Sequence, residues 1–321
     1  RSPDQVHETA GRLAHALAAP VVIDNRPVVT TASIGVSLYP RDGADVGALL
    51  RHSDTAMYQA KDRGRNNFQV FSPAMDRKLK ERVALEHSLR GAMQAGHLSV
   101  HYQPILDVRT RRVVALEALV RWKHPKSGFV PPSKFIPVAE ETGLIVPLGE
   151  FVLERVIRDA CAWRADGATL APIAVNVSAA QLARPDLPKT VARLARQYDF
   201  PPQLLQVELT ESAMIGGTEA RGGEGHADVV EELRALGLRL AIDDFGTGYS
   251  SLGYLKRWRV DAIKIDRSFV RDLVTDASDH AIVGAILAMA RHLGIEVVAE
   301  GVEGWPQLER LRQLNCRYAQ G

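Results

Sequence analysis

Polar side chains that could do chemistry recur near the ends of short apolar runs from residue 98 onward. Most are carboxylates, and in chain order the set is Gln103, Glu117, Asn176, Glu208, Asp243, Asp244, Lys264, Glu300 and Gln320. One acid after one apolar run is usually a solvated loop residue, but the same placement across successive runs indicates a shared site. Ionised carboxylates gathered in one place repel each other, so cations must compensate them.

This donor set favours hard divalent cations. Carboxylate and amide oxygens suit Mg²⁺ or Mn²⁺, whereas zinc and copper prefer His and Cys ligands. The sequence has no H-E-x-x-H motif, and Cys161 and Cys316 are its only cysteines. Two cysteines exclude a disulfide framework or a four-cysteine zinc cluster and fit a reducing compartment. A carboxylate shared by two cations is the common arrangement for attack on a phosphate ester, so we expect that chemistry here.

The adjacent pair Asp243 and Asp244 ends an apolar run and precedes a glycine-rich stretch. Neighbouring residues on a regular strand point to opposite faces, but this alternation lapses at a strand end. We therefore expect Asp244 to turn toward the site that Asp243 faces. Lys264 would lie in the same mouth, as a cation near the attacking hydroxide or the phosphate.

The elements that must position these residues alternate between β-rich runs and helical patterns. The β-rich runs cover residues 99–106, 113–122, 173–178, 204–212, 238–245, 260–268, 295–302 and 316–321. Helical patterns between them include residues 151–164, 189–198, 227–236 and 280–293. Eight such repeats predict an α/β fold of the (β/α)8 TIM-like barrel class, whose strand ends converge on one mouth. The competing doubly wound sheet lacks a supporting G-x-G-x-x-G turn.

The sequence pattern of the N-terminal region predicts a second, smaller α/β unit. Residues 1–72 contain two helical patterns, at 6–17 and 44–63, and a few short β-rich runs, too few strands to close by themselves. Residues 73–96 predict one amphipathic linker helix. Two interpretations of this helix remain open: a solvated connector, or a helix that transmits a signal or forms a dimer.

Composition limits which partners and which kinds of membrane attachment the sequence supports. Forty basic and 38 acidic residues leave a net charge of +2, which gives no argument for a DNA or RNA polymer as partner. The longest apolar stretch of the C-terminal third, residues 281–290, is shorter than the roughly 20 residues that span a bilayer. The sequence begins at Arg1 rather than Met, so we expect a part of a longer protein, truncated at its C-terminal end too. We expect a cytoplasmic location, with membrane attachment through missing N-terminal regions left open.

The motifs "EALVRW", "NVS", "ELTES", "DDFGTGYSSL", "KID", "AEGVE" and "QG" resemble, in order and spacing, those of the EAL-domain cyclic di-GMP phosphodiesterases. The resemblance covers about residues 80 to 321. It implies a barrel that hydrolyses cyclic di-GMP to linear pGpG in bacterial second-messenger signalling, using two Mg²⁺ or Mn²⁺ ions. It also implies a homodimer through the EAL domain.

Carried over by position, the resemblance implies a role for each residue. Glu117, Asn176, Glu208 and Asp243 would hold one cation, and Asp243, Asp244 and Glu300 the other. Lys264 would orient or help deprotonate the attacking water, Gln103, Arg121 and Gln320 would contact substrate, and Glu211 would anchor the "DFGTGYSSL" loop. From the residues alone, Arg121 could equally pair with a helix, and Glu211 and Glu303 could equally anchor loops or touch substrate. The glycine-rich stretch "GGTEARGGEGH" departs from the family pattern as a lengthened loop.

Residues 1–72 resemble only the C-terminal half of a GGDEF, or diguanylate cyclase, domain. The GG(D/E)EF turn is absent from the chain, so cyclase activity does not follow from these residues. The predicted organisation is therefore a partial GGDEF-like unit at 1–72, a helical linker at 73–96 and an EAL barrel at 97–321.

Two other classes of function stay open. A catalytically silent receptor would bind cyclic di-GMP and signal through the linker helix, although every ligand position is present here. A Schiff-base enzyme would use Lys264 against carbonyl substrates, but surrounding carboxylates would raise the lysine pKa and keep it protonated.

Overall fold

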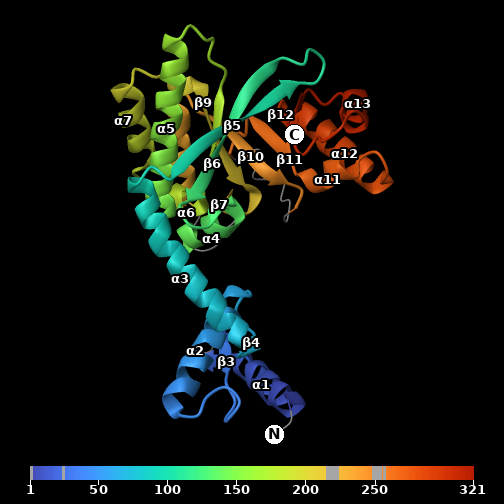
Figure 1. Cartoon of the computed structure of the whole chain (residues 1–321). Coiled ribbons are helices and arrows are strands. Elements are labelled where there is room, and N and C mark those ends of the chain that lie inside the picture. The colour runs from blue at the N-terminus through green and yellow to red at the C-terminus, as the bar shows by residue number, and fades with distance from the viewer. Residues whose placement is uncertain (1–2, 24–25, 215–223, 248–254, 256–257) are drawn as a thin grey trace. The chain divides into compact units, whose positions relative to one another are not determined.

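The computed structural model divides the chain into two compact units, Arg1–His87 and Ser88–Gly321 (Figure 1). It describes residues 3–23, 26–214, 224–247, 255 and 258–321. The "GGTEARGGEGH" stretch and the loop after Asp244 lie mostly outside these residues.

The described part of unit 1 contains two small sheets, the helices α1 (Pro3–Leu17) and α2 (Val46–Asp62), and most of a third helix that continues into unit 2. Strands β1 (Val21–Ile23) and β2 (Arg26–Val28) pair antiparallel, while β3 (Ile34–Val36) and β4 (Phe68–Val70) pair parallel. Strands β2 and β3, although close in the sequence, thus belong to different sheets.

Helix α2 packs closely against β3. A Cβ atom on Gly35 would lie 1.9 Å from the Ser53 carbonyl oxygen, so only glycine allows this approach. The helix begins after Asp45, whose side chain accepts a hydrogen bond from the Ala48 amide, and Gly64 beyond its end has a φ of +92°. These are the usual start and stop signals of a helix.

Helix α3 (Pro73–Gln94) forms over most of the predicted linker. Its last turns contain the buried residues Leu89 and Ala92, which belong to unit 2. Most of its other side chains are partly or fully exposed, which fits the dense charge of its sequence.

Unit 2 is a closed barrel, which confirms the predicted fold class. Its eight barrel strands are β5 (Leu98–Asp107), β6 (Val113–His124), β8 (Ile173–Asn176), β9 (Leu205–Thr210), β10 (Arg239–Phe245), β11 (Ala262–Ile265), β12 (Glu296–Ala299) and β13 (Tyr318–Ala319). The order β5-β13-β12-β11-β10-β9-β8-β6 closes through an additional β5–β6 pairing. A short strand, β7 (Gly128–Val130), pairs with the end of β6.

One strand runs against the other seven. Strand β5 is antiparallel to both β6 and β13, whereas the remaining barrel pairs are parallel. Only residues 108–112 join β5 to β6, which is too short for the crossover that two parallel strands need. A regular (β/α)8 barrel has parallel strands throughout, so the first strand departs from the predicted pattern in its direction.

Helices cover the barrel strands (Figure 1). They are α4 (Pro132–Glu141), α5 (Ile145–Ala165), α6 (Ala179–Leu182), α7 (Leu187–Gln197), α9 (Glu224–Ala235), α11 (Arg267–Arg271), α12 (Ala277–Leu293) and α13 (Trp305–Gln313), with the 3-10 turn η1 (Pro202–Leu204). The four predicted helices appear as α5, α7, α9 and α12, and α5 begins earlier than expected, at Ile145. The core between strands and helices includes the buried residues Ile173, Leu209 and Ile263 from strands and Val156 and Leu194 from helices.

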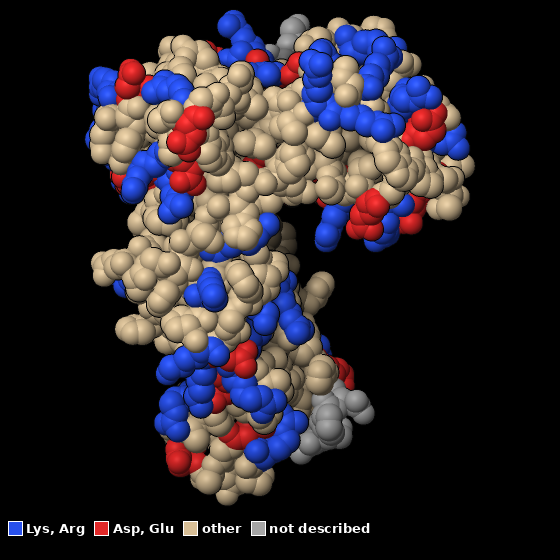
Figure 2. All heavy atoms as spheres, turned by 45° about the horizontal axis from the view of Figure 1, so that its top comes forward, with Lys and Arg blue, Asp and Glu red and all other residues tan. Residues whose placement is uncertain are grey.

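No helix in the described part of the chain combines the length and the apolar character that crossing a lipid bilayer needs. Figure 2 shows Lys and Arg side chains in several groups, with Asp and Glu side chains beside most of them. This mixture agrees with the near balance of charge in the sequence.

Candidate active site

The barrel brings most of the polar residues selected from the sequence into one place. Strand β6 supplies Glu117, β8 ends at Asn176, β9 supplies Glu208, β10 supplies Asp243 and Asp244, β11 supplies Lys264, and Glu300 and Gln320 follow β12 and β13. In such barrels, side chains at the carboxyl ends of parallel strands meet at one mouth.

Lys264 is the centre of this cluster. Its side chain is 1% exposed, and its Nζ atom lies 2.8 Å from Glu208, 2.7 Å from Glu300, 3.1 Å from Glu117 and 3.2 Å from Asp243. A single buried ammonium therefore contacts four carboxylates. It lies among the candidate ligands instead of standing apart from them.

The charges around Lys264 fix its protonation state. Burial lowers the pKa of the lysine, but Glu208, Asp243, Glu300 and Glu117 outweigh burial and raise the pKa above its usual value. An ammonium with a raised pKa has no lone pair for attack on a carbonyl, which speaks against a Schiff-base role.

One lysine does not compensate all of these acids. Burial raises the pKa of Glu208 to about 8, because Lys264 only partly offsets burial and the neighbouring charges of Glu117 and Asp243. Burial likewise raises the pKa of Glu300 to about 7, with a further contribution from Asp243. Both acids thus lie in a site that favours additional positive charge.

Glu117 is held differently. Burial raises its pKa, but Lys264 and hydrogen bonds from Gln320 and Asn176 more than offset burial and lower the pKa. Asn176 Nδ2 donates to Glu117 Oε1 at 2.8 Å, and Gln320 Nε2 donates to Glu117 Oε2 at 2.6 Å. Both oxygens of Glu117 are therefore oriented by neighbouring amides.

The paired aspartates lie where strand β10 loses its regular geometry. The β10–β11 register shifts between Ile242 and Phe245, and Asp244 has a φ of +53°, in the left-handed region. Burial raises the pKa of Asp244, and the charges of Asp243 and Asp266 add to this. The irregular backbone lets two adjacent carboxylates approach one site, which a regular strand would not allow.

Two overlapping groups of carboxylates could each receive a cation. One oxygen from each of Glu117, Glu208 and Asp243 lie within 4.8 Å of one another, and the same holds for Asp243, Asp244 and Glu300. Asp243 belongs to both groups. The donors are oxygens, which Mg²⁺ and Mn²⁺ prefer, so these residues fit a pair of divalent cations.

The three residues expected to contact substrate lie around this cluster. Gln103 is directly opposite Glu117 in the β5–β6 register, so both side chains emerge on the same face of the sheet. Arg121 lines a cavity together with Asn176 and Glu208, and its Nη1 atom donates to the Val120 carbonyl oxygen at 3.0 Å. Gln320 is buried against Glu117.

The cavity beside the cluster has a volume of about 270 Å³. Glu208 and Asn176 are among its polar lining residues. The rest is mostly apolar, with Arg121 and Glu140 among the charged lining residues. Burial raises the pKa of Glu140. Mostly apolar walls with a few polar groups are typical of small-molecule sites.

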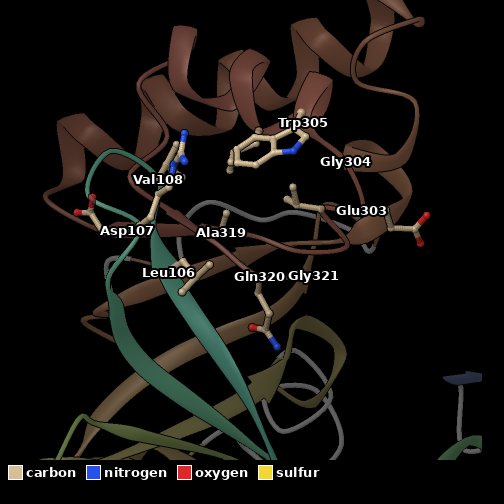
Figure 3. A pocket seen from close by; sticks show the side chains of 12 residues that line it. Leu106, Asp107, Val108, Glu303, Gly304, Trp305, Ala319, Gln320 and Gly321 are labelled. Atoms are coloured by element: carbon tan, nitrogen blue, oxygen red, sulfur yellow. The ribbon is translucent and has the colours of Figure 1, made fainter. Parts of the chain in front are cut away.

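A second cavity of about 270 Å³ lies between the β5–β6 turn and the start of α13. Its lining includes Leu106, Arg111, Trp305 and Gln320 (Figure 3). Figure 3 shows the Gln320 side chain directed away from Trp305. The side-chain amide of Gln320 therefore donates to Glu117 in the carboxylate cluster, while the residue also borders this second cavity, the outer cavity.

The two other acids considered from the sequence, Glu211 and Glu303, lie in different places. Glu211 is buried, and its Oε2 atom accepts a hydrogen bond from the Gly246 amide at 3.3 Å, so it contacts the segment after Asp244. Glu303 is exposed and borders the outer cavity. The rest of the "DFGTGYSSL" loop, from residue 248, is outside the described residues.

Two glutamines near the cluster were not selected from the sequence. Gln206 Nε2 lies 3.4 Å from Glu208 Oε1, two residues away on the same face of β9. Gln181 forms a capping box with Ser178 at the start of α6, just after Asn176. The S-x-x-Q spacing of that box is visible in the sequence and could have identified Gln181.

Comparison with known families agrees with the barrel fold. The family model described as "EAL domain" matches residues 86–321. The chain belongs to the EAL-domain family. Residues 1–67 match the model described as "Diguanylate cyclase, GGDEF domain". Both family resemblances noted in the sequence are thus confirmed.

Curated relatives carry both regions. The chain is 41% identical over 321 residues to "Bifunctional diguanylate cyclase/cyclic di-GMP phosphodiesterase MucR" of Pseudomonas aeruginosa, covering 100% of this chain and 46% of the relative. It is 42% identical over 302 residues to "Cyclic di-GMP phosphodiesterase PdeR" of Escherichia coli, covering 94% of this chain and 45% of the relative. The chain spans less than half of the length of these relatives.

Solved structures resemble the barrel. "PaMucR Phosphodiesterase, c-di-GMP complex" has a TM-score of 0.69 at 42% identity, covering 74% of this chain and 94% of that one. "Structure of EAL Enzyme Bd1971 - cAMP and cyclic-di-GMP bound form" has a TM-score of 0.72 at 29% identity, covering 87% of this chain and 72% of that one.

Proposed function

We propose that unit 2 hydrolyses one phosphodiester bond of cyclic di-GMP, giving linear pGpG, with two divalent cations, Mg²⁺ or Mn²⁺, at the carboxylate cluster. The observation that carries the proposal is the pair of overlapping carboxylate groups that share Asp243 around one buried lysine. Relatives at 41 to 42% identity are named for cyclic di-GMP phosphodiesterase activity, which supports this substrate.

The cation ligands follow from the two groups. Glu117, Glu208 and Asp243, with Asn176 beside Glu117, would hold one cation, and Asp243, Asp244 and Glu300 the other. When bound, such cations acidify a water molecule and neutralise the charge that develops on the phosphate. One water is consumed: its oxygen bonds to phosphorus, the bond from phosphorus to the 3′ oxygen breaks, and that oxygen takes a proton.

The protein side chains would supply position and charge. Lys264 restrains four carboxylates and keeps its proton, so it would act as a fixed cation that orients the attacking water. Arg121 lines the cavity beside the cluster and would pair with a phosphate oxygen. Gln103 and Gln320 would contact the substrate from β5 and from the residue after β13.

The test is direct turnover. The chain is incubated with cyclic di-GMP and Mg²⁺ or Mn²⁺, and pGpG is separated by chromatography. We expect product that disappears with excess EDTA and with Asp243→Asn. The exposed Glu309, which pairs with Arg312 on α13, provides a control, and Glu309→Gln should turn over like the wild type.

Two results would contradict the proposal. Tight binding of cyclic di-GMP without pGpG, in the presence of either cation, would instead identify a receptor module. Turnover that survives EDTA would refute the dependence on cations. Because the family resemblance implies a homodimer through the barrel, these assays are accompanied by sedimentation analysis, and binding without turnover is judged on the dimer.

A further inference from the structure

The second turn of helix α5 carries a buried glycine, Gly149, that the barrel itself does not explain. Glycine is a poor residue for a helix interior because it loses much conformational freedom on folding. Its φ lies outside the left-handed region, so the backbone does not require glycine there. A packing reason must therefore favour it.

That reason is Gln181. A Cβ atom on Gly149 would lie 1.9 Å from Gln181 Nε2 and 2.7 Å from Gln181 Cδ. A flexible side chain could swing away from such a contact, but Gln181 is 5% exposed and its amide oxygen is already engaged. Gln181 Oε1 accepts hydrogen bonds from the Ser178 amide and the Ser178 hydroxyl, both at 3.1 Å.

These hydrogen bonds fix the segment that carries Asn176. Strand β8 ends at Asn176, and the next amide, Val177 N, donates to the Glu208 carbonyl oxygen at 2.9 Å. Ser178 is then held by Gln181. Asn176 is thus fixed on its C-terminal side by two successive contacts, and its side chain donates to Glu117.

We infer that Gln181 is a positioning residue for Asn176 and that Gly149 exists to make room for it. The inference rests on the proposed function, because Asn176 and Glu117 are assigned there to one cation. An alanine at position 149 would push the Gln181 amide off Ser178 and loosen the turn after β8. Gly149, Ser178 and Gln181 also line the cavity beside the cluster, so the disturbance would reach that wall.

On helix propensity alone, Gly149→Ala should stabilise α5. We expect instead that it weakens Mn²⁺ binding and lowers kcat by about 10-fold to 100-fold, the usual range when a neighbour that orients a metal ligand is disturbed. Gly284→Ala is the matched control, because Gly284 also lies within a barrel helix but has room for a Cβ, with Leu314 Cδ2 at 4.0 Å.

The experiment compares Gly149→Ala, Gln181→Ala, the double variant and Gly284→Ala in the full chain. Mn²⁺ affinity is measured by electron paramagnetic resonance, pGpG formation by chromatography, and folding by circular dichroism. If Gly149 acts through Gln181, both single variants lose a similar factor and the double variant loses no more than Gln181→Ala. Gly284→Ala should match the wild type within about twofold.

Three results would overturn the inference. In the first, Gly149→Ala binds Mn²⁺ as tightly as Gly284→Ala does; in the second, the losses of the two single variants multiply in the double variant. In the third, the wild-type chain binds no Mn²⁺. If Gly149→Ala fails to fold, Gln181→Ala alone decides, and normal Mn²⁺ affinity in that variant refutes the role. A wild-type chain that binds Mn²⁺ but forms no pGpG refutes only the proposed function. The inference is then judged on Mn²⁺ affinity.

Discussion

Lys264→Met removes the ammonium from the carboxylate cluster while keeping a side chain of similar length. The lysine is 1% exposed and contacts Glu117, Glu208, Asp243 and Glu300. Removing one partner of a buried ion pair typically costs about 3 to 5 kcal/mol, because the remaining charge stays buried and uncompensated. We expect a loss of this size at pH 8 in the absence of divalent cations.

The loss should depend on pH. Burial already raises the pKa of Glu300 to about 7 and of Glu208 to about 8, and loss of the ammonium would raise both pKa values further. A group whose folded pKa lies above its unfolded value stabilises the fold at low pH, and this stabilisation is lost as pH rises through the folded pKa. The penalty of Lys264→Met should therefore be smaller at pH 6 than at pH 8.

Tryptophan fluorescence reports on the barrel alone, because all four tryptophans of the chain, Trp122, Trp163, Trp258 and Trp305, lie in unit 2. For a unit of this size, each kcal/mol shifts the melting temperature by about 2 to 4 °C. A loss of 3 to 5 kcal/mol thus predicts a decrease of about 6 to 20 °C in EDTA at pH 8. Mn²⁺ at about 100 times its Kd should restore about 2.7 kcal/mol.

Turnover provides the second half of this test. Because Lys264 is proposed to act on the attacking water, Lys264→Met should lower kcat far more than it weakens substrate binding. The exposed Lys189 on α7 provides the control, and Lys189→Met should change stability by less than about 0.5 kcal/mol. A Lys264→Met protein that melts like the wild type in EDTA at pH 8 would refute the four-carboxylate contact. Equal losses in kcat and in substrate affinity would refute the role in catalysis.

Two further predictions concern the cation groups and unit 1. Asp243→Asn should weaken both Mn²⁺ sites in a titration followed by electron paramagnetic resonance, whereas Asp244→Asn should weaken chiefly one; equal effects would contradict the sharing of Asp243. In unit 1, burial raises the pKa of Asp42, but hydrogen bonds from Arg41 and the Leu38 amide more than offset burial and lower the pKa. A carboxyl group whose folded pKa is lowered stabilises the fold at pH values above its unfolded pKa of about 3.9. This stabilisation by Asp42 should be lost as the pH falls below about 3.9 and through the lowered folded pKa. Asp42→Asn should lower the hydrogen-exchange protection of the Leu38 amide about tenfold at pH 7 and remove this acid dependence, and unchanged protection would refute the contribution.

Sequence reasoning was sufficient for the architecture because the barrel is a repetition of local patterns. Alternating β-rich and helical segments are readable from residue types. The helices α7, α9 and α12 appear close to the expected ranges, whereas α5 begins earlier than expected. The short helices α4 and α13 were not among the helical patterns named from the sequence, since a few turns leave little periodicity to detect. The reversed direction of β5 follows from the length of the β5–β6 turn, a local feature that the expectation of uniform repeats overlooked.

The residues of the candidate site could be selected from the sequence because chemistry restricts their types. Carboxylates, an asparagine and a lysine near the ends of apolar runs indicate a cation site before any coordinates are known. Their roles as ligands, and the substrate contacts of Gln103, Arg121 and Gln320, stay predictions for the assays above.

The sequence by itself determined the barrel class, the family and the set of polar residues that gather at the mouth, since these depend on residue types and spacing along the chain. Only the tertiary structure decided that Lys264 lies between four carboxylates and that Gly149 makes room for Gln181. The physical reason is that ion pairs, pKa shifts and steric contacts depend on distances through space. Residues far apart in the chain meet only when the sheet closes.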